Sequence, residues 1–424
     1  MAHFSSRIAI ALVLASTTLA PAAALAQSSE PVASDGQKLS SQAQATQTMF
    51  NAAWDGQAAQ EWVKEHNAAI ASQPSAGGTA APLPTDFSSL APGPATCPAP
   101  GSTATSNISM PKVTASRVAA DTTNETLTRT AVPGTQGRVI KIDIMVLDQA
   151  SQKLYVADRD NVGVDVFDVS GAPKYLTTYK TPAQPNGVVV AGSHLVAGLC
   201  DSTGVNIDLS SGQIVGTVST GGKGRADELD YDPVDNKVYL ANSDDGILSV
   251  IDMGSFKIIK QFTELGPGLE QPRYDSANGK MYLTAGNGLY EYDPTTDTQI
   301  SLDSRSQVQG CTGIQINPKT NQGVISCKSL MTYDFAEGEP IASIDQACAG
   351  DELAYSQALD IYASPAGTSC SFGSTESFVG GSPIGFVTNV PILPGVHNTQ
   401  INDRSKTAYI MGPDGLYSFP VPMR

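Results

Sequence analysis

The sequence has few basic residues, few aromatic residues and almost no tryptophan. Its 424 residues include 25 Lys or Arg against 41 Asp or Glu, a net charge of −16, and 6% are aromatic. Nucleic acids and anionic membrane surfaces are bound through positive patches, so this deficit argues against both as partners. After the N-terminal segment no run approaches about 18 apolar residues, so we expect no membrane span. The 41% hydrophobic content excludes disorder of the whole chain.

The sequence also lacks the short motifs of common enzyme classes. It has no GxSxG elbow, no HExxH pair and no Walker loop. A zinc site is disfavoured because there is no CxxC, and His66, His194 and His397 stand in unrelated contexts. Local motifs therefore assign no catalytic residue.

Residues 1–26 have the pattern of a secretory signal peptide. Arg7 supplies a short positive region, Ile8 to Leu19 is apolar, and Ala24-Leu25-Ala26 forms a cleavage site before Gln27. The alternative is a membrane anchor, but the apolar run is short and rich in Ser, Thr and Ala. We predict export to the periplasm or the cell exterior.

Residues 27–109 differ in composition from the rest of the chain. Apolar residues at helical spacing, among them Met49, Trp54 and Trp62, predict a short helix within residues 40–72. Residues 73–108 are rich in Pro, Gly, Ala and Ser, which is typical of a linker or an extended arm. We predict a helical segment followed by a linker.

Export would place the six cysteines in an oxidising compartment, where disulfides form. Many pairings of six cysteines are possible. Proximity along the predicted hairpins favours Cys311 with Cys327 and Cys348 with Cys370. Cys97 and Cys200 then remain, and a bridge between them would tie the N-terminal segment to the later domain.

A strand pattern recurs seven times between residues 138 and 424. Each copy has a polar turn followed by a short apolar strand, at residues 154–157, 195–197, 238–241, 281–283, 324–326, 361–363 and 409–411. The interval is roughly 42 residues, the length of a four-stranded propeller blade. A β-sandwich is the alternative, but it does not show seven aligned copies. We predict an all-β, seven-bladed propeller over residues 110–424, with residues 110–137 adding a strand to the final blade.

The third copy, Asp232 to Ile259 (DPVDNKVYLANSDDGILSVIDMGSFKII), resembles the repeat of the YVTN, or YncE-like, β-propeller family. The first and fourth copies match it well, and the last three in outline. The resemblance implies a propeller and, since the family is largely of binding or unassigned role, says little about activity. Trp54 and Trp62 are the only tryptophans and precede the repeats, so the tryptophan-bearing motifs of WD40 and quinoprotein blades are absent.

Aligning the repeats places polar residues at the start of each innermost strand. The alignment starts from two copies, Asp227-Glu-Leu-Asp-Tyr231 and Asp351-Glu-Leu-Ala-Tyr355. The first column contains Asp143, Asn186, Asp227, Glu270, Thr312, Asp351 and His397. The second column contains Ile144, Gly187, Glu228, Gln271, Gly313, Glu352 and Asn398. We expect these columns to meet around the axis of the ring.

Converging carboxylates would be costly if they were unpaired, and three interpretations relieve this. One divalent cation, Ca²⁺ or Zn²⁺, would be held by Asp227, Glu270 and Asp351. A polar ligand pocket would be formed by Asp143, Asn186, Arg225, Glu228, Gln271 and Asn398, with Lys223 and Arg273 nearby. Water filling the channel is the third interpretation.

The sequence thus favours an exported binding propeller that recognises a small polar ligand, or an envelope protein or glycan, at the axial mouth. The alternative is a metal-dependent hydrolase, lactonase or lyase, since gluconolactonase-type propellers are similar in outline and hold one divalent ion. In that case the metal would be surrounded by Asp227, Glu228, Glu270, Asp351 and Asn186. His397 or Glu352 would serve as acid or base, and Arg273 would hold a substrate anion. A structural envelope component that docks through residues 28–109 is a third hypothesis.

Overall fold

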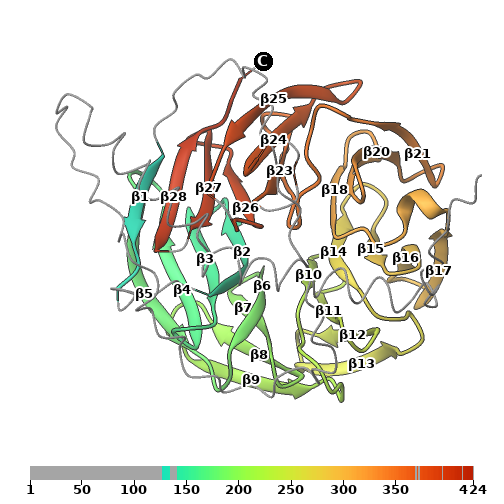
Figure 1. The fold of residues 1–424 in the computed structure, drawn as a ribbon. Coiled ribbons are helices and arrows are strands. Elements are labelled where there is room, and N and C mark those ends of the chain that lie inside the picture. Colours follow the sequence, from blue (N-terminus) through green and yellow to red (C-terminus); the bar gives the residue numbers. More distant parts are fainter. Residues whose placement is uncertain are drawn as a thin grey trace, which may run out of the picture. The chain divides into compact units, whose positions relative to one another are not determined.

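The computed structural model describes residues 127–133, 141–367, 370, 373–393, 395–412 and 414–423. These residues form 28 strands in seven four-stranded antiparallel sheets, which stand around an axis as the blades of a ring (Figure 1). One short 3₁₀ helix, η1 (Ser306–Val308), is the only helix within these ranges. The predicted seven-bladed propeller is confirmed. The predicted signal peptide, N-terminal helix and linker lie outside the described residues.

Each blade is a meander of four consecutive strands. Blade 1 contains β2 (Ile142–Asp148), β3 (Lys153–Asp158), β4 (Gly163–Asp168) and β5 (Lys174–Lys180). Blade 2 contains β6 (Pro185–Ala191), β7 (His194–Leu199), β8 (Thr203–Asp208) and β9 (Ile214–Ser219). Blade 3 contains β10 (Leu229–Asp232), β11 (Lys237–Asn242), β12 (Ile247–Asp252) and β13 (Lys257–Phe262). Blade 4 contains β14 (Glu270–Asp275), β15 (Lys280–Ala285), β16 (Gly288–Asp293) and β17 (Thr298–Asp303).

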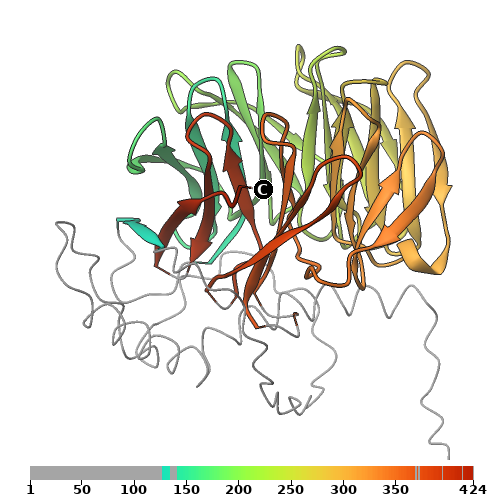
Figure 2. The same cartoon turned by 90° about the horizontal axis from the view of Figure 1, so that it is seen from above.

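The remaining blades follow the same order. Blade 5 contains β18 (Gly313–Asn317), β19 (Gln322–Ser326), β20 (Leu330–Asp334) and β21 (Glu339–Ser343). Blade 6 contains β22 (Ala354–Ser356), β23 (Ile361–Ala366), β24 (Thr375–Gly380) and β25 (Gly385–Pro391). Blade 7 contains β26 (Thr399–Asn402), β27 (Thr407–Gly412), β28 (Gly415–Pro420) and β1 (Thr128–Ala131). The first strand of each blade lies nearest the axis and the last lies outermost (Figure 1), and the side view shows the blades standing around the axis (Figure 2).

The polar turns between the first two strands of each blade explain the regular repeat. In blade 3, Asp232 Oδ1 accepts a hydrogen bond from the backbone N–H of Val234 at 2.8 Å. Asn236, immediately before β11, has a φ of 53°, in the left-handed region that Asn tolerates. The residues before the second strands of other blades also have positive φ: Gln152, Gly279, Asn321, Asp360 and Lys406. One turn geometry therefore sets the strand register in most blades.

The core lies between blades, in layers that two neighbours share. Tyr239 of β11 is fully buried and packs with Leu283 and Tyr292 of blade 4. Its ring meets that of Tyr292 at 5.2 Å between centroids, in an edge arrangement. In blade 6 the tyrosine stands one residue earlier, and Tyr362 stacks on Tyr355 at 4.3 Å. Because each blade buries its faces against its neighbours, no blade is stable alone.

The last blade is completed by the beginning of the described chain. β1 pairs with β28, so the final sheet has the order β1-β28-β27-β26. Arg129 of β1 forms an ion pair with Asp414 at 2.8 Å. The predicted contribution of residues 110–137 to the final blade is confirmed by β1. The pairing joins the two ends of the sequence of blades and closes the ring.

Two inner-strand glycines allow neighbouring blades to approach closely. A Cβ atom added to Gly187 would lie 1.7 Å from the carbonyl oxygen of Asp227, and one added to Gly313 would lie 2.5 Å from that of Asp351. Real Cβ atoms never approach backbone oxygen so closely. These glycines hold the second-column positions of blades 2 and 5, so their missing side chains let the next blade reach the axis.

We predict that Gly187→Ala destabilises the propeller, because the methyl group can be accommodated only by moving the backbone of blade 3. The expected loss in the free energy of unfolding is about 3 kcal/mol, measured by urea denaturation. Gly385→Ala is the matched control, since a Cβ there has no atom within 4 Å. Equal stability of the two variants would contradict the close approach.

Candidate functional site

The innermost strands are irregular where the two polar columns occur. In blade 3 the N–H of Asp227 donates to the carbonyl of Ala241, and the N–H of Ala241 donates to the carbonyl of Glu228, both at 2.8 Å. Two successive residues thus oppose one residue of β11, which is the pattern of a β-bulge. Register shifts also interrupt β2, β6 and β14 near their first residues. A bulge re-aims side chains, so consecutive residues, and not only alternate ones, face the axis.

The structure brings both predicted columns to one mouth at the axis of the ring. Buried first-column residues are Asp143, Asn186, Asp227, Glu270 and His397. Thr312 and Asp351 of the same column are half-buried, so this layer is the one nearer to solvent. The polar second-column residues are all buried: Glu228, Gln271, Glu352 and Asn398. We call this set of residues, with Arg159, Arg225 and Arg273, the axial mouth.

Blades 7, 1 and 2 meet around Asp143. Arg159 forms an ion pair with Asp143, and its Nε donates to Asn186 Oδ1 at 2.9 Å. His397 Nε2 lies 3.4 Å from Asp143 Oδ1, and Asn398 Nδ2 donates to the carbonyl of Asp143 at 2.6 Å. Burial opposes ionisation of Asp143, but Arg159 and His397 outweigh it and hold its pKa below the ordinary value. Burial likewise opposes the charged form of His397, yet Asp143 raises its pKa.

Blade 3 contributes an acid–arginine pair. Arg225 lies 3.0 Å from Asp227 Oδ2 and 3.6 Å from Asp244 Oδ2. Ser243 Oγ lies 3.1 Å from the same Asp227 oxygen and 2.6 Å from the carbonyl oxygen of Leu269, so its one hydroxyl hydrogen can be donated to either acceptor. Burial raises the pKa of Asp227 to about 6, although Arg225 counteracts it. Asp227 Oδ1 has no hydrogen-bond partner among the described residues.

The second column forms a bridge across the mouth. Gln271 Nε2 donates to Glu352 Oε2, and Gln271 Oε1 accepts from the N–H of Ile314 at 2.8 Å. Glu352 also meets the carboxyl group of Glu228 and lies 3.9 Å from Arg273. Burial raises the pKa of both glutamates, and their mutual proximity drives that of Glu228 well above its ordinary range. Blades 3, 4 and 6 are thereby connected through polar side chains.

Acidic groups at the mouth outnumber basic groups. Besides Asp143, Asp227, Glu228 and Glu352, it contains Glu270 and Asp351. Burial, with Asp227 and Asp351 nearby, raises the pKa of Glu270 well above its ordinary value. Burial, with Glu352, raises that of Asp351 to about 6. Six carboxyl groups thus face three guanidinium groups, and the raised pKa values show that this crowding is unfavourable.

Three of the carboxylates could share an ion. Asp227, Glu228 and Glu270 each offer an oxygen, and these oxygens lie within 4.8 Å of one another. All three belong to the residues predicted to surround a metal in a hydrolase. Asp351, also predicted as a metal ligand, is not part of this set.

Two residues on turns also contribute to the axial mouth, and the sequence analysis did not predict them. Arg159 follows β3 and Ser243 follows β11, at the same place in their blades, where the second strand turns into the third. Both reach first-column carboxylates. Both positions directly follow the last residue of the second strand of a blade. Aligning the turns between the second and third strands would therefore have identified them. Lys223, by contrast, is exposed, and its backbone N–H binds Asp245.

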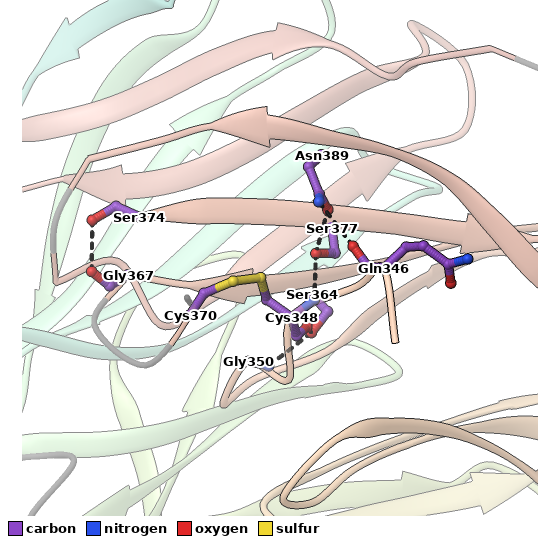
Figure 3. Close-up of a disulfide and its surroundings, with 9 residues drawn as sticks. All are labelled: Gln346, Cys348, Gly350, Ser364, Gly367, Cys370, Ser374, Ser377 and Asn389. Atoms are coloured by element: carbon purple, nitrogen blue, oxygen red, sulfur yellow. Dashed lines mark hydrogen bonds between the residues drawn. A yellow bond between two sulfur atoms is a disulfide. The ribbon is translucent and has the colours of Figure 1, made fainter. Parts of the chain in front are cut away.

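Two disulfides lie next to the inner strands of blades 5 and 6. Cys311 is bonded to Cys327 and Cys348 to Cys370, as the sequence predicted. Cys348 precedes Asp351 by three residues, and its N–H donates to Ser377 Oγ at 2.7 Å (Figure 3). Ser377 donates in turn to Asn389 Oδ1 at 2.7 Å. The disulfide and these bonds hold the segment that carries Asp351. Of the third predicted pair, Cys97 lies outside the described residues.

Comparisons with known proteins establish the fold alone. No family model and no curated protein matches the chain, so membership of the YVTN family stays a prediction. A chain in the crystal structure of the mitotic checkpoint complex is 14% identical with a TM-score of 0.58, covering 76% of this chain and 98% of its own length. The WD40 repeats of RRP9 are 11% identical with a TM-score of 0.57, covering 71% and 99%. Among the described residues, no helix has the length and apolar character that a membrane crossing requires.

We predict that removing the Cys348–Cys370 bridge destabilises the fold. The double variant Cys348→Ser/Cys370→Ser loses a link between residues 22 apart, which constrains the unfolded chain. The free energy of unfolding should fall by about 3 kcal/mol in urea titrations. The free energy of unfolding of wild-type protein treated with a reductant should decrease by at least the same amount. A double variant as stable as the oxidised wild type would contradict this.

We also predict a pH dependence that originates in blade 6. Glu376 of β24 is fully buried, accepts one hydrogen bond from Thr399, and burial raises its pKa to about 8. Because its pKa in the folded state exceeds that in the unfolded chain, its stabilising effect is complete below about pH 4.5 and is lost as the pH rises through about 8.

The Glu376→Gln variant should therefore lack this part of the pH dependence. Its stability relative to wild type should improve between pH 5 and 9 by an amount on the order of 4 kcal/mol, measured by urea titration at each pH. Glu337→Gln, at an exposed turn of blade 5, is the control and should leave the wild-type slope unchanged. If the free energies of unfolding of wild type and Glu376→Gln changed in parallel with pH, Glu376 would not be the source of the pH dependence.

Proposed function

We propose that this protein is an exported binding propeller that captures a small polar ligand with a positively charged group at the axial mouth. One observation carries the proposal: six carboxyl groups converge on three guanidinium groups, and most of them are buried. The pKa values of five of these acids are raised, so a bound cation would relieve a cost that the free protein bears.

The burial of the site favours a small ligand over a macromolecular partner. The side chains of Asp227, Glu352 and His397 retain less than a tenth of their exposure. A protein or glycan surface could touch Asp351 and Thr312, which are half-buried, but not the deeper second column. The three arginines add donors for carboxylate or hydroxyl groups of the same ligand.

Export is supported by two independent features. Residues 1–26 have the pattern of a signal peptide, and the described residues contain two disulfides. Disulfides persist in oxidising compartments such as the periplasm and the cell exterior.

The ligand class can be tested with a panel of compounds. Small amines, diamines and amino acids should raise the melting temperature and bind saturably in calorimetry, whereas simple carboxylates should not. Asp351→Asn should weaken the best ligand on the order of tenfold or more, because a charge at the mouth is lost. Asp345→Asn, exposed in the same loop, is the matched control and should bind like wild type.

Two results would reject this proposal. One is a panel without any saturable ligand, and the other is equal binding by wild type and Asp351→Asn. If a protein or a glycan were captured instead and the capture were insensitive to Asp351→Asn, the interaction surface would lie elsewhere on the ring.

The hydrolase alternative has one observation in its favour, the Asp227, Glu228 and Glu270 group. Its predicted acid–base residues are already engaged, since Glu352 accepts from Gln271 and His397 contacts Asp143. Hydrolysis of lactones or esters that requires a divalent ion and is lost in Glu352→Gln or His397→Gln would support this alternative. Absence of turnover with the ion bound would reject it.

A further inference from the structure

We propose that Asp227, Glu228 and Glu270 form a calcium site at the axial mouth, where blades 3 and 4 adjoin. The proposal rests on the proposed function only in placing the ion in the same mouth. It assigns the ion to one side and leaves Asp351, on blade 6, for the organic ligand.

The backbone brings the three carboxylates together. The bulge opposite Ala241 aims both Asp227 and Glu228 at the axis, and Glu270 starts the inner strand of the next blade. Their oxygens lie within 4.8 Å of one another. Oxygen atoms on opposite sides of a calcium ion are about 5 Å apart, because each Ca–O distance is roughly 2.4 Å. The group therefore has the dimensions of a calcium site.

Two oxygens of this group lack a partner. Asp227 is 2% exposed and Glu228 is 3% exposed, yet Asp227 Oδ1 and Glu228 Oε2 accept no hydrogen bond from the described residues. A buried carboxylate oxygen without a donor or an ion costs stability. Both oxygens belong to carboxylates of the Asp227, Glu228 and Glu270 group, so a single cation bound through them would satisfy both.

The neighbouring arginine does not fill this role. Arg225 contacts Asp227 through Oδ2 and otherwise reaches Asp244, on the turn after β11. Ser243 Oγ lies 3.1 Å from the same Oδ2. The guanidinium group thus engages Oδ2 and leaves Oδ1 of Asp227 without a hydrogen-bond partner among the described residues.

The charge balance fits a divalent ion. With all six carboxyl groups ionised, three arginines and a protonated His397 leave two carboxylate charges at the mouth without a counter-charge. A divalent ion at Asp227, Glu228 and Glu270 would supply two positive charges.

The donor set selects calcium among common divalent ions. All three ligands are carboxylates, with no thiolate or imidazole, which disfavours zinc. Magnesium requires shorter bonds of about 2.1 Å and a nearly ideal octahedron, whereas calcium accepts six to eight oxygens in variable geometry. Three carboxylates supply at most six oxygens, so a calcium ion here would keep room for water or a ligand atom.

The test is calcium binding by the purified full-length protein after treatment with EDTA and dialysis. Calorimetry with CaCl₂ should give about one site per chain, and elemental analysis of protein purified with CaCl₂ should find about one calcium ion. Glu228→Gln and Glu270→Gln keep the side-chain shape and should each weaken binding on the order of 100-fold. Asp345→Asn should bind as wild type does.

The outcomes separate this proposal from the proposed function. Calcium binding that both Gln variants lose, with no amine ligand found, supports the ion site and rejects the ligand. Amine binding by protein that takes up no calcium rejects the ion site and supports the ligand. Calcium binding that is unchanged in both variants places the ion elsewhere and also rejects this site. Circular dichroism confirms that each variant is folded. If neither is folded, Asp227→Asn is tested in the same way, and a wild type that binds no calcium rejects the site in any case.

Discussion

Closure of the ring is the constraint on which the rest of this structure depends. Each blade exposes two apolar faces until its neighbours cover them, so the sequence of blades must end where it began. The pairing of β1 with β28 makes this connection on the outside of the final blade. On the inside, Gln400 of blade 7 donates to the carbonyl of Met145 in blade 1, and Asn398 donates to that of Asp143. The same closing interface thus holds part of the axial mouth.

The mouth is a region that the closed ring can support and an isolated blade could not. Bulges at the start of the inner strands direct charged side chains toward one another, which is unfavourable by itself. Tyrosine-rich layers between blades supply the compensating stability, and Gly187 and Gly313 let the backbones approach closely enough for the polar columns to meet. The Cys311–Cys327 and Cys348–Cys370 bridges secure the inner strands of blades 5 and 6. The stable packing between blades therefore supports an electrostatically unfavourable group of acids at the axis, and functional sites commonly have such a local cost.

The similarity to WD40-type propellers illustrates how fold and function separate. TM-scores of 0.58 and 0.57, at only 14% and 11% identity, show a shared fold over most of the chain. The acid and arginine residues at the axis occupy positions that the fold leaves open, so the chemistry there belongs to this sequence.

The sequence by itself determined the number of blades, the turns and two of the disulfide pairs. Those features are local or periodic: Asn236 favours its turn through its own side chain, and the apolar repeat can bury its faces in few ways. The two polar columns also followed from the repeat, because equivalent residues of equivalent strands meet at one axis.

Tertiary structure alone decided which of the axial residues touch. Arg159 lies on the turn after β3, yet it reaches Asp143 of the inner strand and Asn186 of the next blade. Asp227 and Glu228 both offer an oxygen to the group that includes Glu270, because a bulge turns two consecutive side chains to the same side. Gln271 of blade 4 donates to Glu352 of blade 6, although blade 5 lies between these two blades in the chain. Such contacts depend on backbone irregularities and on side-chain conformations, and neither leaves a periodic signal in the sequence.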